Sequence, residues 1–345
     1  MAKGESTAAV RAAIDDRGWS RTRLWVEQTL PPGKRIRAVA TLRGGWTSEM
    51  RRLEVGGTQE RGSQGGGTQE GGVQEPSSLV LRSFTKPFYV KHALGLLTRE
   101  ADILRFLDGT DVPAARLHAV DAAAEHCDHP SLVMSLLPGS VRLDEQDEQD
   151  VERKSQLLAR HLAALHALTV PEADRPRTYE AWTGPERVRI PDDTKRPGLW
   201  RRAVDVIRRP ALAHRSCFLH RDFHPGNVLF TGHGAGLAIS GVVDWVETSW
   251  GPADLDVAHC STATALLHGV QAGMGLVVPY LAAGGTLSDD PADHLYWRLL
   301  DALAFAPDAE KVAVPWRDLG RSDLTPAVLT QRLEDYLQAL FDQYG

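Results

Sequence analysis

Cysteines are scarce in this chain of 345 residues: Cys127, Cys217 and Cys260 are the three, and no two of them form a C-x-x-C pair. Three thiols cannot build a disulfide framework, so we expect a protein of the reducing cytoplasm. Long apolar runs are also missing, which predicts that no segment spans a bilayer. The first 25 residues lack the apolar stretch of a signal peptide, so we expect no secretion signal.

Positive charge is in short supply as well. Lys and Arg number 39 against 45 Asp and Glu, which gives a formal net charge of −6. Without a basic excess, the sequence indicates neither nucleic-acid binding nor binding to an anionic membrane. Residues before Gly139 carry +2 and those from Gly139 onward carry −8, so the acidic excess lies wholly in the second half.

Several familiar site patterns are absent. There is no G-x-x-x-x-G-K-[ST] P-loop, no G-x-S-x-G elbow and no dinucleotide fingerprint. Metal-capable side chains occur at His126–His129 and at His220 and His224. Neither group has a further ligand pair at the spacing of a zinc site, so we interpret these histidines as structural.

A repeat interrupts the first half of the chain. Residues 56–65, GGTQERGSQG, are followed directly by GGTQEGGVQE, and both are nearly without apolar side chains. Such a segment buries too little to offset its ordering entropy, so we expect a disordered insert over residues 56–77. Short β-leaning segments surround it and predict antiparallel strands at Ile36–Leu42, Met50–Val55 and Leu79–Phe84.

A helix is predicted next, at Leu94–Leu107, from apolar residues on one stripe. Glu100 falls inside that stripe, four residues from both Leu96 and Leu104. An unpaired buried charge is very costly, so this inward carboxylate requires a cationic partner. Two more strands are predicted at Arg116–Val120 and Ser131–Leu136.

After Gly139 the pattern becomes helical. Helices are predicted at Val151–Leu168, Leu199–Arg208, Leu255–Gly269, Asp293–Phe305 and Thr325–Phe341. The acidic run at residues 144–150 suits the N-terminus of the first of these and a solvated surface. A strand-rich front and a helical back predict two lobes, residues 1–138 and 139–345, joined near Pro138 and Gly139.

The densest cluster of polar residues lies at residues 217–230. Apolar residues flank a polar core that contains Pro and Gly, which predicts a rigid loop between two buried segments. Asp222 and Asn227 sit five apart in that loop, and Asp244 ends a predicted strand at Leu237–Val243. Two carboxylates and a carboxamide can hold a divalent cation by oxygen ligands and leave one carboxylate as a base.

The pattern H-x-D-x-x-x-x-N, followed by an apolar strand that ends in Asp, resembles the catalytic and metal-binding pair of kinases. Here it is HRDFHPGN at residues 220–227, then VDW at residues 243–245, and then Gly251 and Pro252 leading to Asp256. This version is similar to the aminoglycoside phosphotransferase family, which is related to choline kinases. The resemblance covers roughly residues 38–305. It implies an α+β, two-lobed protein-kinase-like fold, with an antiparallel-sheet N-lobe and a mostly helical C-lobe.

The resemblance also implies a role for each residue of the motif. Asp222 is expected to receive the proton of the substrate hydroxyl. Asn227 and Asp244 are expected to hold the Mg²⁺ that bridges the phosphates of ATP. Arg82 lies on a strand similar to the one that carries the phosphate-binding cation, and Glu100 is expected to pair with it.

Further nucleotide contacts follow from the same resemblance. The loop at residues 43–48 lies where the family covers the phosphates, and its candidate residues are Gly44, Gly45, Thr47 and Ser48. The segment at residues 133–139 is expected to be the interlobe hinge. Backbone groups of Ser135 and Leu137 would face adenine there.

Three positions depart from the family pattern. Arg82 stands where a lysine is usual, and although Arg can clamp phosphate with two N–H groups, the two residues are not interchangeable. The glycine loop has only Gly44 and Gly45. The acid after Asp244 comes one residue later than is often seen, at Glu247, and receives no role.

These observations predict an ATP- and Mg²⁺-dependent phosphotransferase that acts on a hydroxyl of a small molecule. The acidic second half mildly favours an aminoglycoside-like or other cationic acceptor, while an amino alcohol such as choline, an amino sugar and a macrolide-like acceptor stay open. The alternative from another class is a kinase-like protein that binds nucleotide without turnover. A protein kinase is disfavoured because no Asp-Phe-Gly or Ala-Pro-Glu segment follows Asp244. The sequence points to no particular protein partner.

Overall fold

The computed structural model describes residues 18–42, 47–57, 77–143, 147–210 and 212–345. Gly44, Gly45 and most of the predicted insert lie outside these ranges. Among the described helices, none is long and apolar enough to cross a membrane. The chain divides into two units, the first made of Met1–Arg105 and Ala115–Leu136 and the second of Phe106–Ala114 and Leu137–Gly345.

Unit 1 is built on a five-stranded antiparallel sheet with the strand order β1-β2-β3-β5-β4. Its strands are β1 Lys34–Leu42, β2 Glu49–Gly57, β3 Ser77–Ser83, β4 Leu117–Asp121 and β5 Ser131–Ser135. Leu53 and Val55 of β2 are buried while Glu54 between them is exposed, as expected for a strand with one face on the core. The predicted strands are therefore confirmed, with ends shifted by a few residues.

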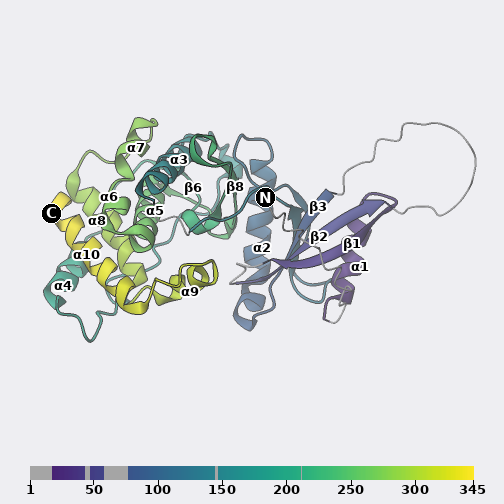
Figure 1. The fold of residues 1–345 in the computed structure, drawn as a ribbon, viewed down its shortest axis with the longest axis horizontal. Coiled ribbons are helices and arrows are strands. Elements are labelled where there is room, and N and C mark those ends of the chain that lie inside the picture. The colour runs from purple at the N-terminus through teal and green to yellow at the C-terminus, as the bar shows by residue number, and fades with distance from the viewer. Residues whose placement is uncertain (1–17, 43–46, 58–76, 144–146, 211) are drawn as a thin grey trace, which may run out of the picture. The chain divides into compact units, whose positions relative to one another are not determined.

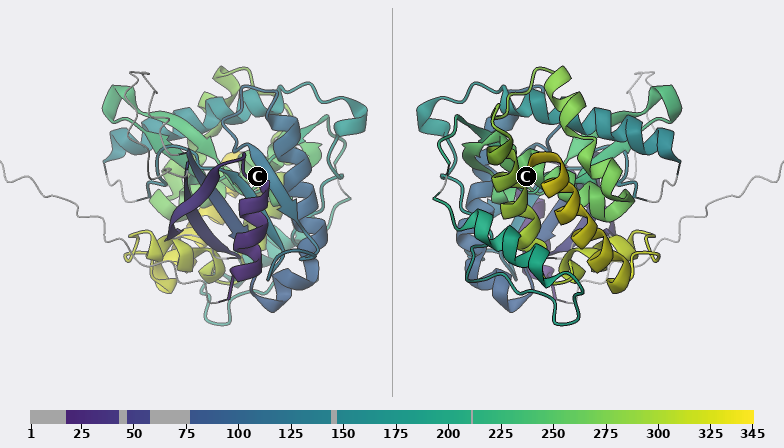
Figure 2. Two further views of the ribbon diagram at one scale, coloured as in Figure 1. Left: turned by 90° about the vertical axis from the view of Figure 1, so that its right-hand side faces the viewer. Right: turned by 90° about the vertical axis from the view of Figure 1, so that its left-hand side faces the viewer.

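Two helices accompany this sheet. The first, α1 Ser20–Thr29, packs against β1 and β4 and contributes Trp25 and Val26 to the core (Figures 1 and 2). The second, α2 Pro87–Leu107, begins earlier than the predicted Leu94. Proline at the first helical position is pre-organised for a helix start. The apolar stripe missed residues 87–93, where the large apolar side chain of Phe88 is exposed and lies on no buried face.

Unit 2 is mostly helical, and the expected α+β architecture of the chain is confirmed. Its α-helices are α3 Glu148–His166, α4 Pro197–Ile207, α5 Ala253–His268, α6 Val270–Met274, α7 Val277–Ala282, α8 Pro291–Ala302, α9 Glu310–Asp318 and α10 Pro326–Tyr344. The Asp147 side chain caps α3 by accepting a hydrogen bond from the Gln149 amide, as the acidic run predicted. Nearly every residue of α5 is buried, because α3, α6, α8 and α10 surround it (Figure 1).

Two small antiparallel sheets and several 3₁₀ turns complete unit 2. One sheet pairs β6 Ser216–Leu219 with β9 Ser249–Pro252, and the other pairs β7 Val228–Thr231 with β8 Ala238–Val242. The 3₁₀ turns are η1 Glu172–Asp174, η2 Pro225–Asn227, η3 Gly234–Gly236, η4 Trp245–Glu247 and η5 Leu303–Phe305.

Residues 106–114 belong to unit 2, although they lie on the N-terminal side of the single boundary expected from the sequence. The amide of Val242 donates to the Pro113 carbonyl at 2.9 Å, and the rings of Phe106 and Phe218 lie 5.6 Å apart. Both contacts lie within unit 2 and hold residues 106–114 against its small sheets. The change from strands to helices along the sequence predicts a single domain boundary, so it could not show that residues 106–114 belong to unit 2.

Candidate active site

The polar cluster of the sequence forms one loop that begins where β6 ends. His220 follows β6, η2 contains Asn227, and Asp244 follows β8. Because Val228 of β7 pairs with Val242 of β8, and the Val243 amide donates to the Asn227 carbonyl, Asn227 and Asp244 are held at the same end of this sheet. The sequence prediction of a loop followed by a strand that leads to Asp244 is confirmed, with the strand ending at Val242.

Asp256, at the start of α5, fixes the backbone of this loop. Its carboxylate accepts hydrogen bonds from the amides of His220 and Arg221, at 2.8 and 2.7 Å. Arg221 has a φ of 71°, a left-handed conformation that is unusual for a residue with a side chain. Burial raises the pKa of the Asp256 carboxyl, but a hydrogen bond from His166 and nearby positive charge outweigh it and lower that pKa below its ordinary value. Asp256 therefore acts as an ionised anchor.

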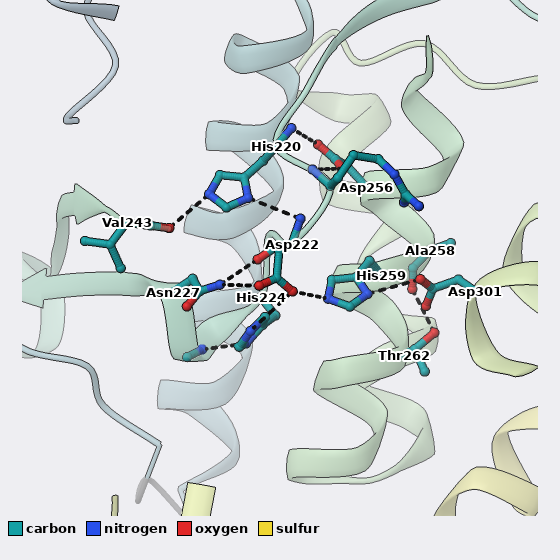
Figure 3. Close-up of polar contacts among 12 residues, drawn as sticks. His220, Asp222, His224, Asn227, Val243, Asp256, Ala258, His259, Thr262 and Asp301 are labelled. Carbon is teal, nitrogen blue, oxygen red and sulfur yellow. Dashed lines mark hydrogen bonds and ion pairs between the residues drawn. The ribbon is translucent and has the colours of Figure 1, made fainter. Parts of the chain in front are cut away.

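The His220 ring also braces the loop. Its Nε2 donates to the Val243 carbonyl at 3.1 Å, and its Nδ1 accepts from the Asp222 amide at 3.2 Å (Figure 3). A ring that donates at one nitrogen and accepts at the other is neutral. Burial lowers the pKa of this fully enclosed imidazole, in agreement with that form. The structural role predicted for His220 is confirmed.

Asp222 has both carboxylate oxygens engaged. Its Oδ2 accepts from Asn227 Nδ2 at 3.0 Å, and its Oδ1 lies 3.1 Å from His259 Nε2 (Figure 3). The side chain remains 31% exposed, so a substrate can reach it. Burial raises the pKa of this carboxyl, but the hydrogen bond from His259 and the charge of that ring outweigh it, and the net pKa is well below its usual range.

His259 and Asp301 are residues that sequence reasoning missed. His259 lies on α5, and its Nδ1 is 3.1 Å from Asp301 Oδ1 of α8. Asp301 sits in an apolar helix just as Glu100 does, between Leu300 and Ala302. The argument that an inward carboxylate needs a cationic partner would have found it.

The possible metal ligands form two different groups. Asp222, His224 and His259 offer ligand atoms within 4.8 Å of one another, a spacing that metal sites use. Both nitrogens of His259 face carboxylates, however, and a ring that donates from both nitrogens has no lone pair for a metal. The amide oxygen of Asn227 and the carboxylate of Asp244 are hard oxygen ligands of the kind that Mg²⁺ prefers, so this second group fits that ion. The charge of Asp244 raises the pKa values of both His220 and His224, in agreement with its place near the Asp222 loop.

Unit 1 carries a second buried polar group. Arg82 Nη1 donates to both oxygens of Glu100, at 2.8 and 3.0 Å, and Arg82 Nη2 donates to the Thr47 hydroxyl at 3.2 Å. The side chains of Arg82 and Glu100 are 4% and 2% exposed. The predicted ion pair is confirmed. Ser48 is also buried, with its hydroxyl 3.5 Å from Met50 Sδ.

The backbone amides of Ser135 and Leu137, two residues of the expected hinge, differ in whether they donate a hydrogen bond. The Ser135 amide donates to the Arg116 carbonyl at 2.8 Å, so it is already used within the sheet of unit 1. The Leu137 amide makes no hydrogen bond within the part of the chain that the structure describes. Of these two amides, Leu137 is therefore the one available to a ligand.

The chain matches the model of the phosphotransferase enzyme family APH over residues 68–300. A protein from Ralstonia eutropha JMP134, provisionally described as an aminoglycoside phosphotransferase, is 17% identical, with a TM-score of 0.59 and coverage of 94% of this chain and 97% of that one. A macrolide 2'-phosphotransferase type I is 19% identical, with a TM-score of 0.54 and coverage of 93% and 98%. The spectinomycin phosphotransferase APH(9)-Ia, solved with ADP and spectinomycin, is 12% identical, with a TM-score of 0.52 and coverage of 94% and 98%.

At these identities the solved structures show the shared kinase-like fold. Among curated protein sequences no significant match was found. The family model covers well over half of the chain, and it matches the region that contains the Asp222 loop. The chain therefore belongs to the APH phosphotransferase enzyme family.

Proposed function

We propose that this phosphotransferase uses ATP and Mg²⁺ to phosphorylate a hydroxyl group of a small molecule. The observation that carries the proposal is the Asp222 carboxylate, which is half-buried, held at both oxygens and still reachable from solvent. Phosphoryl transfer asks little more of a protein than positioning and charge stabilisation. A fixed carboxylate beside two oxygen ligands meets that requirement.

Asp222 would accept a hydrogen bond from the acceptor hydroxyl and receive its proton as the new P–O bond forms. Because the pKa of Asp222 is low, the carboxylate is ionised at neutral pH, as this role demands. Asn227 and Asp244 would hold the metal. When bound, Mg²⁺ would neutralise the charge that develops on the transferring phosphoryl group.

In this proposal the residues of unit 1 serve the nucleotide. The guanidinium of Arg82 would contact the phosphates, and Glu100 would keep it in place through the two hydrogen bonds between them. The loop with Thr47 and Ser48 would cover the phosphates. Leu137 would donate its amide to adenine, with Ser135 next to it in the same segment.

Unit 2 would supply the catalytic loop and bind the acceptor. Aromatic rings stand near Asp222: Trp182 contacts His259 edge-on with centroids 4.9 Å apart, and Trp316 lies 6.1 Å from the His224 ring. Trp182 is partly exposed, which suits stacking against a ring of the acceptor. A cytoplasmic location fits the same proposal, because all three cysteines are free thiols.

The test is nucleotide consumption, followed as ADP or GDP release, across a panel of hydroxylated acceptors. The panel contains aminoglycosides, macrolides, amino alcohols and amino sugars, each with ATP or GTP. We expect Asp222→Asn to reduce turnover of the best acceptor by about 10²- to 10⁴-fold. Asp205→Asn, at an exposed position on α4, is the matched control and should behave as wild type.

Equal turnover by wild type and Asp222→Asn would contradict the assigned mechanism. Faster turnover with GTP than with ATP would overturn the choice of nucleotide. If calorimetry detects Mg·ATP binding and no acceptor is phosphorylated, the protein is instead a nucleotide-binding member of the family without turnover.

A further inference from the structure

His259 connects the proposed catalytic base to a second buried acid, and the family resemblance assigns it no role. We propose that His259, held as an imidazolium by Asp301, is a positioning residue that keeps the Asp222 carboxylate in the orientation needed to receive the acceptor hydroxyl. The inference rests on the proposed function, because it concerns how Asp222 performs its step.

With Asp222 and Asp301 both ionised, the hydrogen-bond geometry requires the charged ring. His259 Nε2 lies 3.1 Å from Asp222 Oδ1, and His259 Nδ1 lies 3.1 Å from Asp301 Oδ1 (Figure 3). An ionised carboxylate accepts hydrogen bonds and donates none, so both ring nitrogens must carry a proton. A neutral imidazole would turn a lone pair toward one of the two acids.

The surroundings strengthen these contacts by keeping water out. The His259 and Asp301 side chains are 4% and 1% exposed. The Phe305 ring stacks on His259 at 5.7 Å, and Trp182 contacts its edge. Ion pairs gain strength in such a low-dielectric environment.

Few other charges act on the ring. His224, 5.7 Å away, is neutral at neutral pH, because burial lowers its pKa to about 4. His220 is neutral as well, as its hydrogen bonds show. Lys311 interacts electrostatically with Asp301, while its ammonium donates to the Ala304 carbonyl.

Asp301 is the acid that most needs the imidazolium. Its Oδ2 is buried and has no hydrogen-bond partner within the described residues, so His259 is its main compensation. Burial lowers the pKa of His259, but the charge of Asp301 and the hydrogen bonds to Asp222 and Asp301 outweigh it and raise that pKa to about 9. The ring is therefore charged below about pH 9 and becomes neutral as the pH rises through that value.

The consequence for Asp222 is a fixed carboxylate plane. Asn227 holds one oxygen and His259 holds the other, so rotation of the carboxylate breaks at least one hydrogen bond. Loss of either contact frees the base to adopt other orientations. Such misplacement lowers kcat more than it changes the KM of the nucleotide, because the hydroxyl is engaged by Asp222 at the reacting end.

Two substitutions of His259 separate the effect of the donor's position from the effect of the ring's charge. In His259→Gln the amide nitrogen replaces Nε2, so a donor to Asp222 remains without the charge. In His259→Asn the amide nitrogen replaces Nδ1, so the donor faces Asp301 and Asp222 loses its partner. We expect His259→Asn to lower kcat at pH 7.5 by about 100-fold and His259→Gln by about 10-fold, with KM for ATP within about 2-fold of wild type.

The pH profile of kcat tests the link to Asp301. Wild type should lose activity as the pH rises through about 9. Asp301→Asn should move this alkaline limb down by about 1 to 3 pH units, since an opposite charge at this distance shifts a pKa by that amount. The pH profiles of His259→Gln and His259→Asn should show no loss of kcat near pH 9. His294→Gln, on the same helix as Asp301, should keep the wild-type profile.

Nitrogen NMR of ring-labelled histidines provides a readout without activity. The His259 signal, identified by its loss in His259→Gln, should be that of a doubly protonated ring at pH 7.5. A neutral His259 would overturn the inference and leave the proposed function intact. The same holds if Asp301→Asn folds, as judged by circular dichroism, and keeps the alkaline limb of the wild-type pH profile. A doubly protonated His259 in a protein that phosphorylates no acceptor would overturn the proposed function and retain the ion pair.

Discussion

Replacing Glu100 with Gln removes the charge of a buried carboxylate while nearly preserving its shape. Arg82 donates to both oxygens of Glu100, and the two side chains are 4% and 2% exposed. Removing one partner of such a pair costs about 3–5 kcal/mol, because the remaining charge stays buried without its counter-charge. Since domains are stable by about 5–15 kcal/mol, this is a large share of the free energy of unfolding.

The assay is urea unfolding followed by circular dichroism. With a dependence of about 1–3 kcal/mol per molar urea, the midpoint should fall by about 1 M or more in Glu100→Gln. The control lies on the same helix: Asp102 pairs with Arg105, but both are more than half exposed, so Asp102→Asn should cost less than about 1 kcal/mol. Equal midpoints for Glu100→Gln and Asp102→Asn would refute the reasoning.

A double replacement tests the cause of the loss. In Arg82→Met combined with Glu100→Leu, both buried charges are gone and apolar side chains of similar volume take their place. Such a change is often neutral or stabilising, so the double variant should be more stable than Glu100→Leu alone. A double variant that is less stable by the sum of the two single losses would show that charge burial does not govern this site.

Two further changes address the backbone near the catalytic loop and the expected hinge. Asp256→Asn should lower turnover by about 10-fold or more with little change in the KM of the nucleotide. The reason is that one of the His220 and Arg221 amides loses its ionised acceptor. An unchanged kcat would refute the anchoring role of Asp256. Gly139→Ala should lower the urea midpoint by the equivalent of about 1–3 kcal/mol, because Gly139 has a φ of +90° and an added Cβ would lie 2.4 Å from Ser240 Oγ; an unchanged midpoint would contradict this.

The sequence predicted features that depend on neighbours along the chain or on one strong physical requirement. The strands of unit 1 follow from short segments of β-leaning composition, and the Arg82–Glu100 pair follows from the cost of a buried charge. The start of α2 was missed because Phe88, near its first residue, is exposed and adds nothing to the buried stripe. Hydrophobic periodicity follows burial, so it fails wherever a helix begins in solvent.

The His259–Asp301 contact could not be located by spacing. It joins α5 to α8, and α5 is buried on all sides, so it has no polar face on which a histidine would stand out. In the sequence of a helix with a single apolar stripe, a charged residue inside the stripe can be recognised as buried. The sequence of a fully enclosed helix has no such stripe, and in α5 the buried histidine stands among small residues such as Ser261 and Thr262. The signal that remained was Asp301 itself, an acid between apolar neighbours.

The structure also changes what the acidic second half implies about the acceptor. A count of acids treats each one alike, yet Asp256 and Asp301 are buried and committed to internal hydrogen bonds. In the cavity between α3, α6, α7 and α10, Glu148, Glu152 and Asp323 are matched in number by Arg160, Arg321 and Arg332.

The two buried acids and this balanced cavity therefore add no net negative charge to the surface of unit 2. The field that an acceptor meets is set by local pairing rather than by the charge of a whole half. The −8 charge of the second half therefore does not by itself describe the field at Asp222, and the preference for a cationic acceptor stays a prediction.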